Sequence, residues 1–246
     1  MKLLNRVNSV RKEYSALMQA IIFDMDGVLV DSMHYHAEAW EVALKTVGIT
    51  IDKKIIYELE GANYRQVIDI ILRQFGRIPT EEDVQDIGSK KLTIFGQIAR
   101  VKPFDGIKEL LETLKPKYKL AVVSGSNRST VHETLNTFFP DTFHVVVDGE
   151  ETKLCKPSPE PYLKAVERLG VSKDRCLVIE NAPLGIRSAK NAGLRCIAVT
   201  SYLDQECLKE ADLILDNHRE IGLYIQNIVN NKTKKQPELR SSCGFS

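Results

Sequence analysis

Two aspartates, Asp24 and Asp26, stand one residue apart immediately after a short apolar run. That run, Ala20–Phe23, predicts a buried strand, and open α/β sheets bind their ligands at the carboxyl ends of strands. Asp24 can attack an electrophile such as phosphorus, and Asp26 can deliver or remove a proton. Because two neighbouring carboxylates repel each other, we expect a cation between them, and hard oxygen ligands favour Mg²⁺.

An acidic turn or a calcium-binding loop could also place two aspartates at this spacing. When the pair is considered alone, an acidic turn that ends a strand accounts for it about as well as a catalytic pair does. A calcium-binding loop is excluded, because the twelfth position counted from Asp24 must be acidic and here is Tyr35.

Hydroxyl and ammonium groups follow two later parts of the chain. Ser124, Gly125 and Ser126 end another apolar run and precede a helical pattern, so that hydroxyls and free N–H groups could cradle an anion. Lys156 opens a proline-rich loop, whose stiffness would hold the ammonium group beside a nucleophilic carboxylate and a phosphoryl oxygen. Each feature also has a simpler explanation when it is considered alone. The serines and the glycine could form an ordinary turn, and Lys156 could be a solvated lysine before a helix.

Glu180 and Asn181 come directly after a further buried run. Their oxygens could complete a metal site begun by Asp24 and the backbone carbonyl of Asp26. The alternative is that Asn181 caps a helix with Pro183 in its first turn.

An alternation of strands and helices must position these residues. Six short runs rich in Ile and Val mostly lack period-2 alternation, as strands covered on both faces should. The predicted strands are 20–24, 119–124, 143–147, 176–180, 195–200 and 212–215, and the predicted helices between them are 105–115, 128–138, 159–170 and 184–192. This order predicts an α/β fold with a doubly wound parallel sheet, whose strand ends gather all four motifs at one crevice.

One segment breaks the alternation. Residues 33–100 show helical apolar stripes and no convincing strand, which predicts a helical insert after the first strand that returns to the sheet near Pro103. We therefore expect a core made of residues 19–32 and 101–229. We further expect a helical extension at 1–18 and a disordered tail at 230–246.

Composition excludes several classes of protein. The 246 residues carry 34 basic and 33 acidic side chains, which argues against a nucleic-acid binder that relies on a basic field. No apolar run approaches the length of a membrane span. The five cysteines form no C-x-x-C pair, which favours free thiols in a reducing compartment. We expect a cytoplasmic monomer or weak dimer whose partner is a small molecule, with neither nucleic acid nor membrane involved.

The combined motifs resemble those of the haloacid dehalogenase (HAD) superfamily. The matching segments are Asp24-Met25-Asp26-Gly27-Val28-Leu29 with Asp31-Ser32, Ser124-Gly125, Lys156-Pro157, Glu180-Asn181 and the closing run 185–193. The insert resembles a C1 cap, and residues 35–40 resemble the β-phosphoglucomutase-like subfamily. The usual Glu-Asp-Ser of the fourth motif is Glu180-Asn181-Ala182 here, so that an uncharged amide oxygen would replace a carboxylate at the metal.

This resemblance implies a Mg²⁺-dependent phosphatase that acts on a small phosphorylated metabolite, such as a sugar phosphate, through an aspartyl-phosphate. The implied catalytic residues are Asp24 as nucleophile, Asp26 as acid and base, and Ser124 and Lys156 as phosphoryl binders. The implied metal ligands are Asp24, Asp26, Glu180 and Asn181. The implied substrate contacts are Gly125, Ser126, His36 near the first hinge and Arg65, with Lys90 and Lys91 as further candidates that equally suit a helix surface.

Three other functions remain open at this point. A β-phosphoglucomutase-type phosphomutase and a pyrophosphatase of the same subfamily would share the core residues. A receiver-like regulator that only binds phosphate would need the acceptor aspartate but neither Asp26 nor a cap. The sequence lacks G-x-x-x-x-G-K-[ST], G-x-G-x-x-G and H-E-x-x-H, which disfavours a P-loop NTPase, a Rossmann dehydrogenase and a zinc protease.

Overall fold

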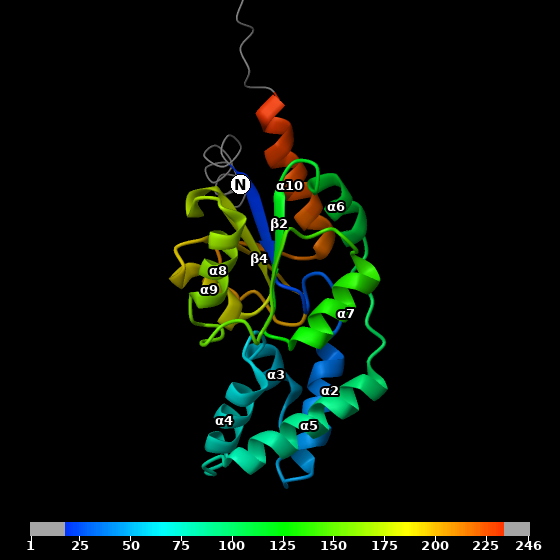
Figure 1. The fold of residues 1–246 in the computed structure, drawn as a ribbon, viewed down its shortest axis with the longest axis vertical. Coiled ribbons are helices and arrows are strands. Elements are labelled where there is room, and N and C mark those ends of the chain that lie inside the picture. The colour runs from blue at the N-terminus through cyan, green and yellow to red at the C-terminus, as the bar shows by residue number, and fades with distance from the viewer. Residues whose placement is uncertain (1–17, 234–246) are drawn as a thin grey trace, which may run out of the picture.

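A computed structural model describes residues 18–233, which are built around a six-stranded parallel sheet (Figure 1). The strand order is β3-β2-β1-β4-β5-β6, so that β1 lies in the interior of the sheet between β2 and β4. Phe23, the last residue of β1, is paired with Val122 and with Ile179, which brings the carboxyl ends of three strands to one edge. The strands are β1 (Ala20–Phe23), β2 (Lys119–Val123), β3 (Val145–Val147), β4 (Cys176–Glu180), β5 (Arg195–Val199) and β6 (Leu213–Leu215).

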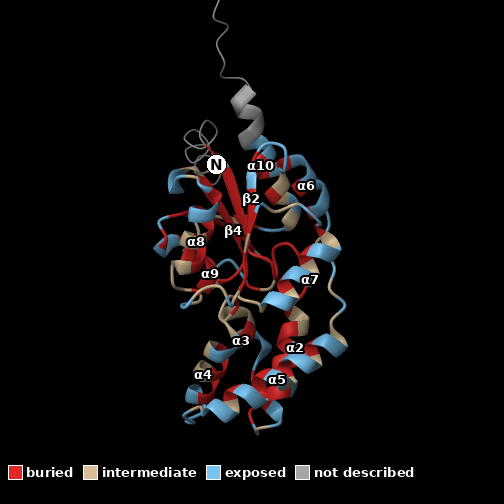
Figure 2. Cartoon of the chain, in the orientation of Figure 1, coloured by how far each residue is buried: buried red, intermediate tan, exposed pale blue. Residues whose placement is uncertain are grey.

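Both faces of the sheet are covered, which Figure 2 shows as a red interior. Ile21 and Phe23 face one hydrophobic cluster, whereas Ala20 and Ile22 face the other, because successive side chains of a strand point to opposite sides. The first cluster is closed by α6 (Ile107–Leu114), α7 (Arg128–Phe138) and α10 (His218–Thr233), and the second by α8 (Glu160–Leu169) and α9 (Pro183–Asn191). The predicted doubly wound α/β fold is confirmed.

A second, all-helical unit follows β1 and hangs below the sheet in Figure 1. It has its own hydrophobic cluster, centred on Trp40, Leu44, Ile71 and Ile87. Its helices are α2 (Met33–Lys45), α3 (Lys53–Glu58), α4 (Tyr64–Gln74) and α5 (Glu81–Ile98). The predicted helical cap after the first strand is thus confirmed.

The helix starts of the cap follow local rules, with one exception. The side chain of Asp52 caps α3, that of Asn63 caps α4, and Thr80 forms a capping box with Asp83 at α5. Ser32 stands at the N-cap of α2 but makes no capping hydrogen bond with its side chain. The hydroxyl of Ser32 donates instead to Asp26 Oδ1, at 2.6 Å.

The structure differs from the sequence expectations mainly at the ends of elements. The third strand begins at Val145 instead of 143, and a short 3₁₀ turn, η1 (Lys173–Arg175), precedes β4. Helix α10 continues to Thr233, so residues 230–233, the start of the predicted tail, are helical. Met18 is buried and lies in no helix, while the rest of the predicted N-terminal helix and residues 234–246 lie outside the described range. Among the described helices, none is long and apolar enough to cross a membrane.

Candidate active site

Asp24 lies directly after β1, at the edge of the sheet where the parallel strands end. Its amide donates to the Ile179 carbonyl (2.9 Å), which continues the pairing of β1 with β4 by one residue. Oδ1 accepts a hydrogen bond from Lys156 Nζ at 2.5 Å, whereas the buried Oδ2 has no hydrogen-bond partner in the described part of the chain. Asp24 therefore keeps one oxygen bound to a cation and leaves the other available for chemistry.

Lys156 joins two carboxylates inside the protein. Its Nζ donates to Asp24 Oδ1, to Glu180 Oε1 at 2.6 Å and to the Val123 carbonyl at 3.2 Å. Burial alone would lower the pKa of Lys156, but the charges of Asp24 and Glu180 outweigh it and raise the pKa. The ammonium group is therefore charged at any physiological pH and offsets part of the negative charge at this edge of the sheet.

Several carboxylates surround Asp24, and their combined negative charge is larger than the single positive charge of Lys156. Burial raises the pKa of Asp24 well above its ordinary value, and the carboxylates of Glu180 and Asp26 raise it further against the opposing effect of Lys156. A site with this surplus attracts a further cation.

Asp26 is surrounded by hydrogen-bond donors. Three hydroxyls donate to it, namely Ser32 Oγ to Oδ1 (2.6 Å), Ser126 Oγ to Oδ2 (2.9 Å) and Ser124 Oγ to Oδ2 (3.3 Å). His36 Nε2 lies 3.3 Å from Oδ1. Burial alone would raise the pKa of Asp26, but His36 and the hydroxyl hydrogen bonds outweigh it and hold the pKa well below its ordinary value. Asp26 is thus a carboxylate at rest, ready to accept a proton.

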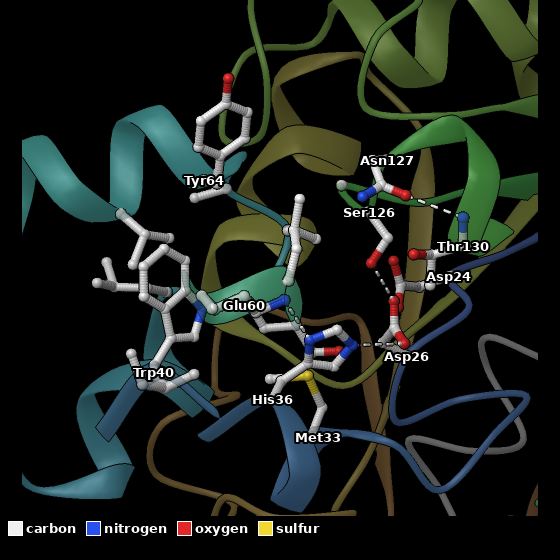
Figure 3. A pocket seen from close by; sticks show the side chains of 18 residues that line it. Asp24, Asp26, Met33, His36, Trp40, Glu60, Tyr64, Ser126, Asn127 and Thr130 are labelled. Atoms are coloured by element: carbon white, nitrogen blue, oxygen red, sulfur yellow. Dashed lines mark hydrogen bonds and ion pairs between the residues drawn. The ribbon is translucent and has the colours of Figure 1, made fainter. Parts of the chain in front are cut away.

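A short chain of polar groups extends from Asp26 into the cap. Lys91 Nζ donates to His36 Nδ1 at 2.9 Å. The opposite ring nitrogen of His36 then donates to Asp26, along the dashed line between these two residues in Figure 3. Burial and the charge of Lys91 lower the pKa of His36, so the imidazole is neutral near pH 7 and acts on Asp26 through its hydrogen bond. Burial also lowers the pKa of Lys91 to about 8.

Glu60, in the loop between α3 and α4, is a site residue that the sequence prediction missed. Its Oε2 accepts a hydrogen bond from Asn181 Nδ2 at 2.7 Å, and both residues are buried. Burial raises the pKa of Glu60 well above its ordinary value, and the neighbouring Asp24, Glu180 and Asp26 add to the shift. The available signal was an acid directly before a glycine, in a polar break between two apolar helical patterns.

Three buried oxygens in this region have no hydrogen-bond partner within residues 18–233, and they belong to Asp24 (Oδ2), Glu60 (Oε1) and Asn181 (Oδ1). Unpartnered buried oxygens are costly unless a cation or water satisfies them, and carboxylate and amide oxygens are ligands that Mg²⁺ accepts. No group of three or more His, Cys, Asp or Glu side chains with metal-binding geometry occurs in the described range, so any ligand set is mixed. The residues present therefore fit a hard divalent cation bound with the help of an amide.

Residues of the core and of the cap together line a partly open cavity. Asp24, Asp26 and Ser126 form one wall, and Trp40 and Tyr64 belong to the opposite wall, which the cap supplies (Figure 3). The loop at Gly61 approaches so closely that a Cβ there would lie 2.5 Å from Lys156 Cδ. The space suits a small anionic group held against the two aspartates.

Residues 21–199 match the family model of the haloacid dehalogenase-like hydrolases, which is most of the chain. The chain belongs to this family. A phosphorylated carbohydrates phosphatase of Thermotoga maritima is 30% identical over 202 residues, which cover 80% of this chain and 93% of that protein. A β-phosphoglucomutase of Bacillus subtilis is 31% identical over 189 residues, which cover 74% and 83%. The structure of a Bacteroides vulgatus protein, provisionally assigned as a β-phosphoglucomutase, superposes with a TM-score of 0.83 at 32% identity and covers 95% and 97% of the two chains.

The structure of this haloacid dehalogenase-like hydrolase brings most of the predicted site residues together. Lys156 bonds to Asp24, Ser124 bonds to Asp26, and His36 reaches Asp26 from α2. The residues Asp24, Asp26, His36, Gly125 and Ser126 all line the cavity.

The positions of Arg65 and Glu180 differ from their predicted roles as a substrate contact and a metal ligand. Arg65 does not line the cavity, because its guanidinium is exposed and forms two hydrogen bonds with Glu81, at 2.7 and 2.9 Å. Both oxygens of Glu180, predicted as a metal ligand, are already engaged, Oε1 by Lys156 and Tyr162 and Oε2 by the backbone amides of residues 181 and 182. The structure thus places Glu180 as the group that holds Lys156.

Proposed function

We propose that this protein is a Mg²⁺-dependent phosphatase that hydrolyses a small phosphorylated metabolite, such as a sugar phosphate, through an aspartyl-phosphate on Asp24. The observation that carries the proposal is the contrast within the aspartate pair. Asp24 has an oxygen without a hydrogen-bond partner in the described chain, whereas Asp26 is held by hydroxyls and an imidazole. A nucleophile and an acid–base group need this difference.

In the first step, a carboxylate oxygen of Asp24 attacks phosphorus, the bond between phosphorus and the ester oxygen breaks, and Asp26 gives its proton to the departing alkoxide. Asp26 is ionised at rest, and the negative charge of a bound phosphate ester favours its protonation beforehand. In the second step, the Asp26 carboxylate takes a proton from water as the water oxygen attacks the aspartyl-phosphate. Inorganic phosphate leaves and Asp24 is restored.

The remaining residues bind and orient the transferring group. Lys156 remains charged throughout and offsets the negative charge that gathers at Asp24, while Ser124 and the Gly125 segment contribute a hydroxyl and backbone N–H groups. Asp24 and Asn181 would hold Mg²⁺ together with the backbone carbonyl of Asp26. When bound, the ion supplies positive charge that offsets the repulsion between Asp24 and the phosphoryl group.

A pyrophosphatase is the second candidate, and Glu60 is the observation that favours it. Glu60 brings an additional buried carboxyl group from the cap to the site, where it bonds to Asn181 and has one oxygen without a hydrogen-bond partner among the described residues. That oxygen suits a substrate that arrives with its own Mg²⁺, as pyrophosphate does.

The test is phosphate release from a substrate panel, with Mg²⁺ and with excess EDTA. The panel contains p-nitrophenyl phosphate, several sugar phosphates, pyrophosphate and β-glucose 1-phosphate with a bisphosphate activator. Hydrolysis of monoesters that stops with EDTA supports the phosphatase, and a strong preference for pyrophosphate selects the second candidate. Conversion of β-glucose 1-phosphate to its isomer indicates a mutase, and turnover that is indifferent to EDTA contradicts the metal site.

We also propose a cytoplasmic location. The four cysteines in the described range are free thiols, which supports a reducing compartment.

A further inference from the structure

Tyr202 belongs to the loop after β5, yet it packs into the cap. Its ring stacks on Tyr57 of α3, with ring centroids 5.1 Å apart and an angle of 17° between the ring planes. Tyr202 is also one of the side chains that pack against the hydrophobic cluster of the cap. A residue of the core is therefore part of the interior of the cap.

The loop that carries Tyr202 is fixed to the core on both sides of it. Thr200 Oγ1 donates to the Asp216 carbonyl at 2.9 Å, and Leu203 is buried in one of the two core clusters. The hydroxyl of Ser201 donates to the carbonyl of Gly27, the residue directly after Asp26. Tyr202 thus extends toward the cap from a support that also contacts the turn of the catalytic aspartates.

The hydroxyl of Tyr202 bonds to the hinge between core and cap. It donates to Asp31 Oδ1, two residues before α2 begins at Met33. Asp31 is a hinge residue because its own amide donates to the Lys102 carbonyl (2.8 Å), where the chain returns from the cap. The Tyr202 hydroxyl therefore bonds to the hinge directly beside Ser32, the N-cap residue of the first cap helix.

The start of α2 lacks the usual side-chain cap. The first amides of a helix lack acceptors within the helix, and the N-cap side chain ordinarily supplies one. Here the N-cap residue, Ser32, directs its hydroxyl to Asp26 at 2.6 Å. The bond from Tyr202 to Asp31, the residue before Ser32, therefore holds the chain that leads into this uncapped helix start.

The same first turn of α2 carries both cap-side partners of Asp26. Ser32 bonds to Asp26 Oδ1, and His36 approaches the same oxygen from one turn further along. A tilt of this turn would move both donors away from Asp26 together. We propose that Tyr202 is a positioning residue, which holds the first turn of α2 so that Ser32 and His36 keep Asp26 oriented for proton transfer. This inference rests on the proposed function, in which Asp26 is the acid and base.

The test compares Tyr202→Phe with Tyr57→Phe. The first variant removes the hydroxyl that bonds to the hinge and keeps the ring stack, whereas Tyr57 has no hydrogen bond from its hydroxyl among the described residues and serves as a matched control. With p-nitrophenyl phosphate and Mg²⁺, Tyr202→Phe should lower kcat by about tenfold with little change in KM, as expected for loss of a hydrogen bond to a charged group. Tyr57→Phe should leave both constants near the wild-type values.

A double-mutant cycle with Ser32→Ala shows whether Tyr202 acts through the first turn of α2. The combined variant should lose much less kcat than the product of the two single losses, because both changes release the same contact to Asp26. Losses that multiply would overturn the inference. Should Tyr202→Phe fold poorly, Asp31→Ala removes the other end of the bond at a half-exposed position and should give the same pattern.

A measurement without turnover separates this inference from the proposed function. Trp40, the single tryptophan of the chain, is buried in the cap wall of the cavity. Tyr202→Phe should increase the quenching of its fluorescence by acrylamide relative to Tyr57→Phe, and equal quenching overturns the inference. A wild-type protein that releases no phosphate from any ester contradicts the function, whereas an active wild type with an equally active Tyr202→Phe contradicts only the role of Tyr202.

Discussion

The core half and the cap half of the site rest on different supports. In the core, Asp24 and Glu180 lie at the ends of β1 and β4, whose relative positions are fixed by sheet register, and Lys156, from the loop before α8, bonds to both. In the cap, His36 and Glu60 come from a helix and a loop of a unit with its own hydrophobic cluster. A sheet edge holds groups that must not move during bond making, whereas a hinged helical unit can complete the site on closing and open it for exchange.

Two lysines are buried within the described residues, and they show the same contrast in their electrostatics. Lys156 bonds to two carboxylates, which raise its pKa. Lys91 bonds to a neutral imidazole and has only the more distant charge of Asp26, so burial lowers its pKa to about 8. The ammonium group of Lys156 in the core therefore stays charged, whereas that of Lys91 in the cap begins to lose its proton under mildly alkaline conditions.

The largest effect is expected for Asp24→Asn, which tests whether the core half makes the bond. Turnover should fall on the order of 10⁴-fold or more, because no other carboxylate occupies the nucleophile position. The amide can still accept from Lys156 and removes a charge from an over-negative site, so the thermal midpoint should not fall. Steady-state phosphate release and a thermal melt check both points, and normal turnover by a folded variant would contradict the assignment.

Asp26→Asn should lower kcat by roughly 10²–10⁴-fold, the usual range for loss of a general acid–base group. Asp26 is the residue where the two halves meet, since Ser124 and Ser126 contact it from the core and His36 from the cap. Rapid-quench measurement with ³²P-labelled substrate should show slow formation or slow breakdown of the aspartyl-phosphate. An unchanged kcat would remove Asp26 from the mechanism.

Gly61→Ala should lower kcat/KM by about tenfold to a hundredfold, since small misplacements at a site carry costs of this size. Gly61 has φ +90°, and a Cβ there would lie 2.5 Å from Lys156 Cδ, so the cap could not close fully on the core. Gly76→Ala is the matched control, because Gly76 also has a positive φ (+74°) but has no atom within 4 Å of a Cβ. Equal losses in the two variants would show that backbone strain, and not closure, limits activity.

The smallest expected effect is on the free energy of unfolding. Lys91→Met measures how much the buried charge of Lys91 destabilises the fold. At pH 7 the folded wild type retains a buried charge whose pKa is lowered from 10.5 to about 8, so the variant should be more stable by up to roughly 3 kcal/mol. Above pH 8 the folded wild type releases this proton while the unfolded chain still binds it, so wild-type stability rises with pH and the difference shrinks. Urea unfolding at pH 7 and 9.5 measures the difference. Lys90→Met, at an exposed pair with Asp86, should show none of this pH dependence, and a constant difference for Lys91→Met would contradict the prediction.

The core half of the site could be predicted because its residues are close to strand ends in the sequence. A parallel sheet brings the residues after each strand to one edge, so Asp24, Ser124 and Glu180 needed only a correct assignment of β1, β2 and β4. Arg65 shows where this logic fails, since position on a helix does not specify which way the side chain faces. Arg65 binds Glu81 on the exposed side of α4 and α5.

The sequence by itself determined the alternation of strands and helices, the helical insert and the acidic, hydroxyl and ammonium groups at the sheet edge, because periodicity and strand ends are local properties. Only the tertiary structure decided that Glu60 enters the site, that Glu180 holds Lys156, and that Tyr202 bonds to the hinge before the first cap helix. These contacts join residues 24 to 171 positions apart, and they depend on how two separate hydrophobic clusters are oriented across a hinge. No local pattern encodes that orientation, because it results from the packing of the whole chain.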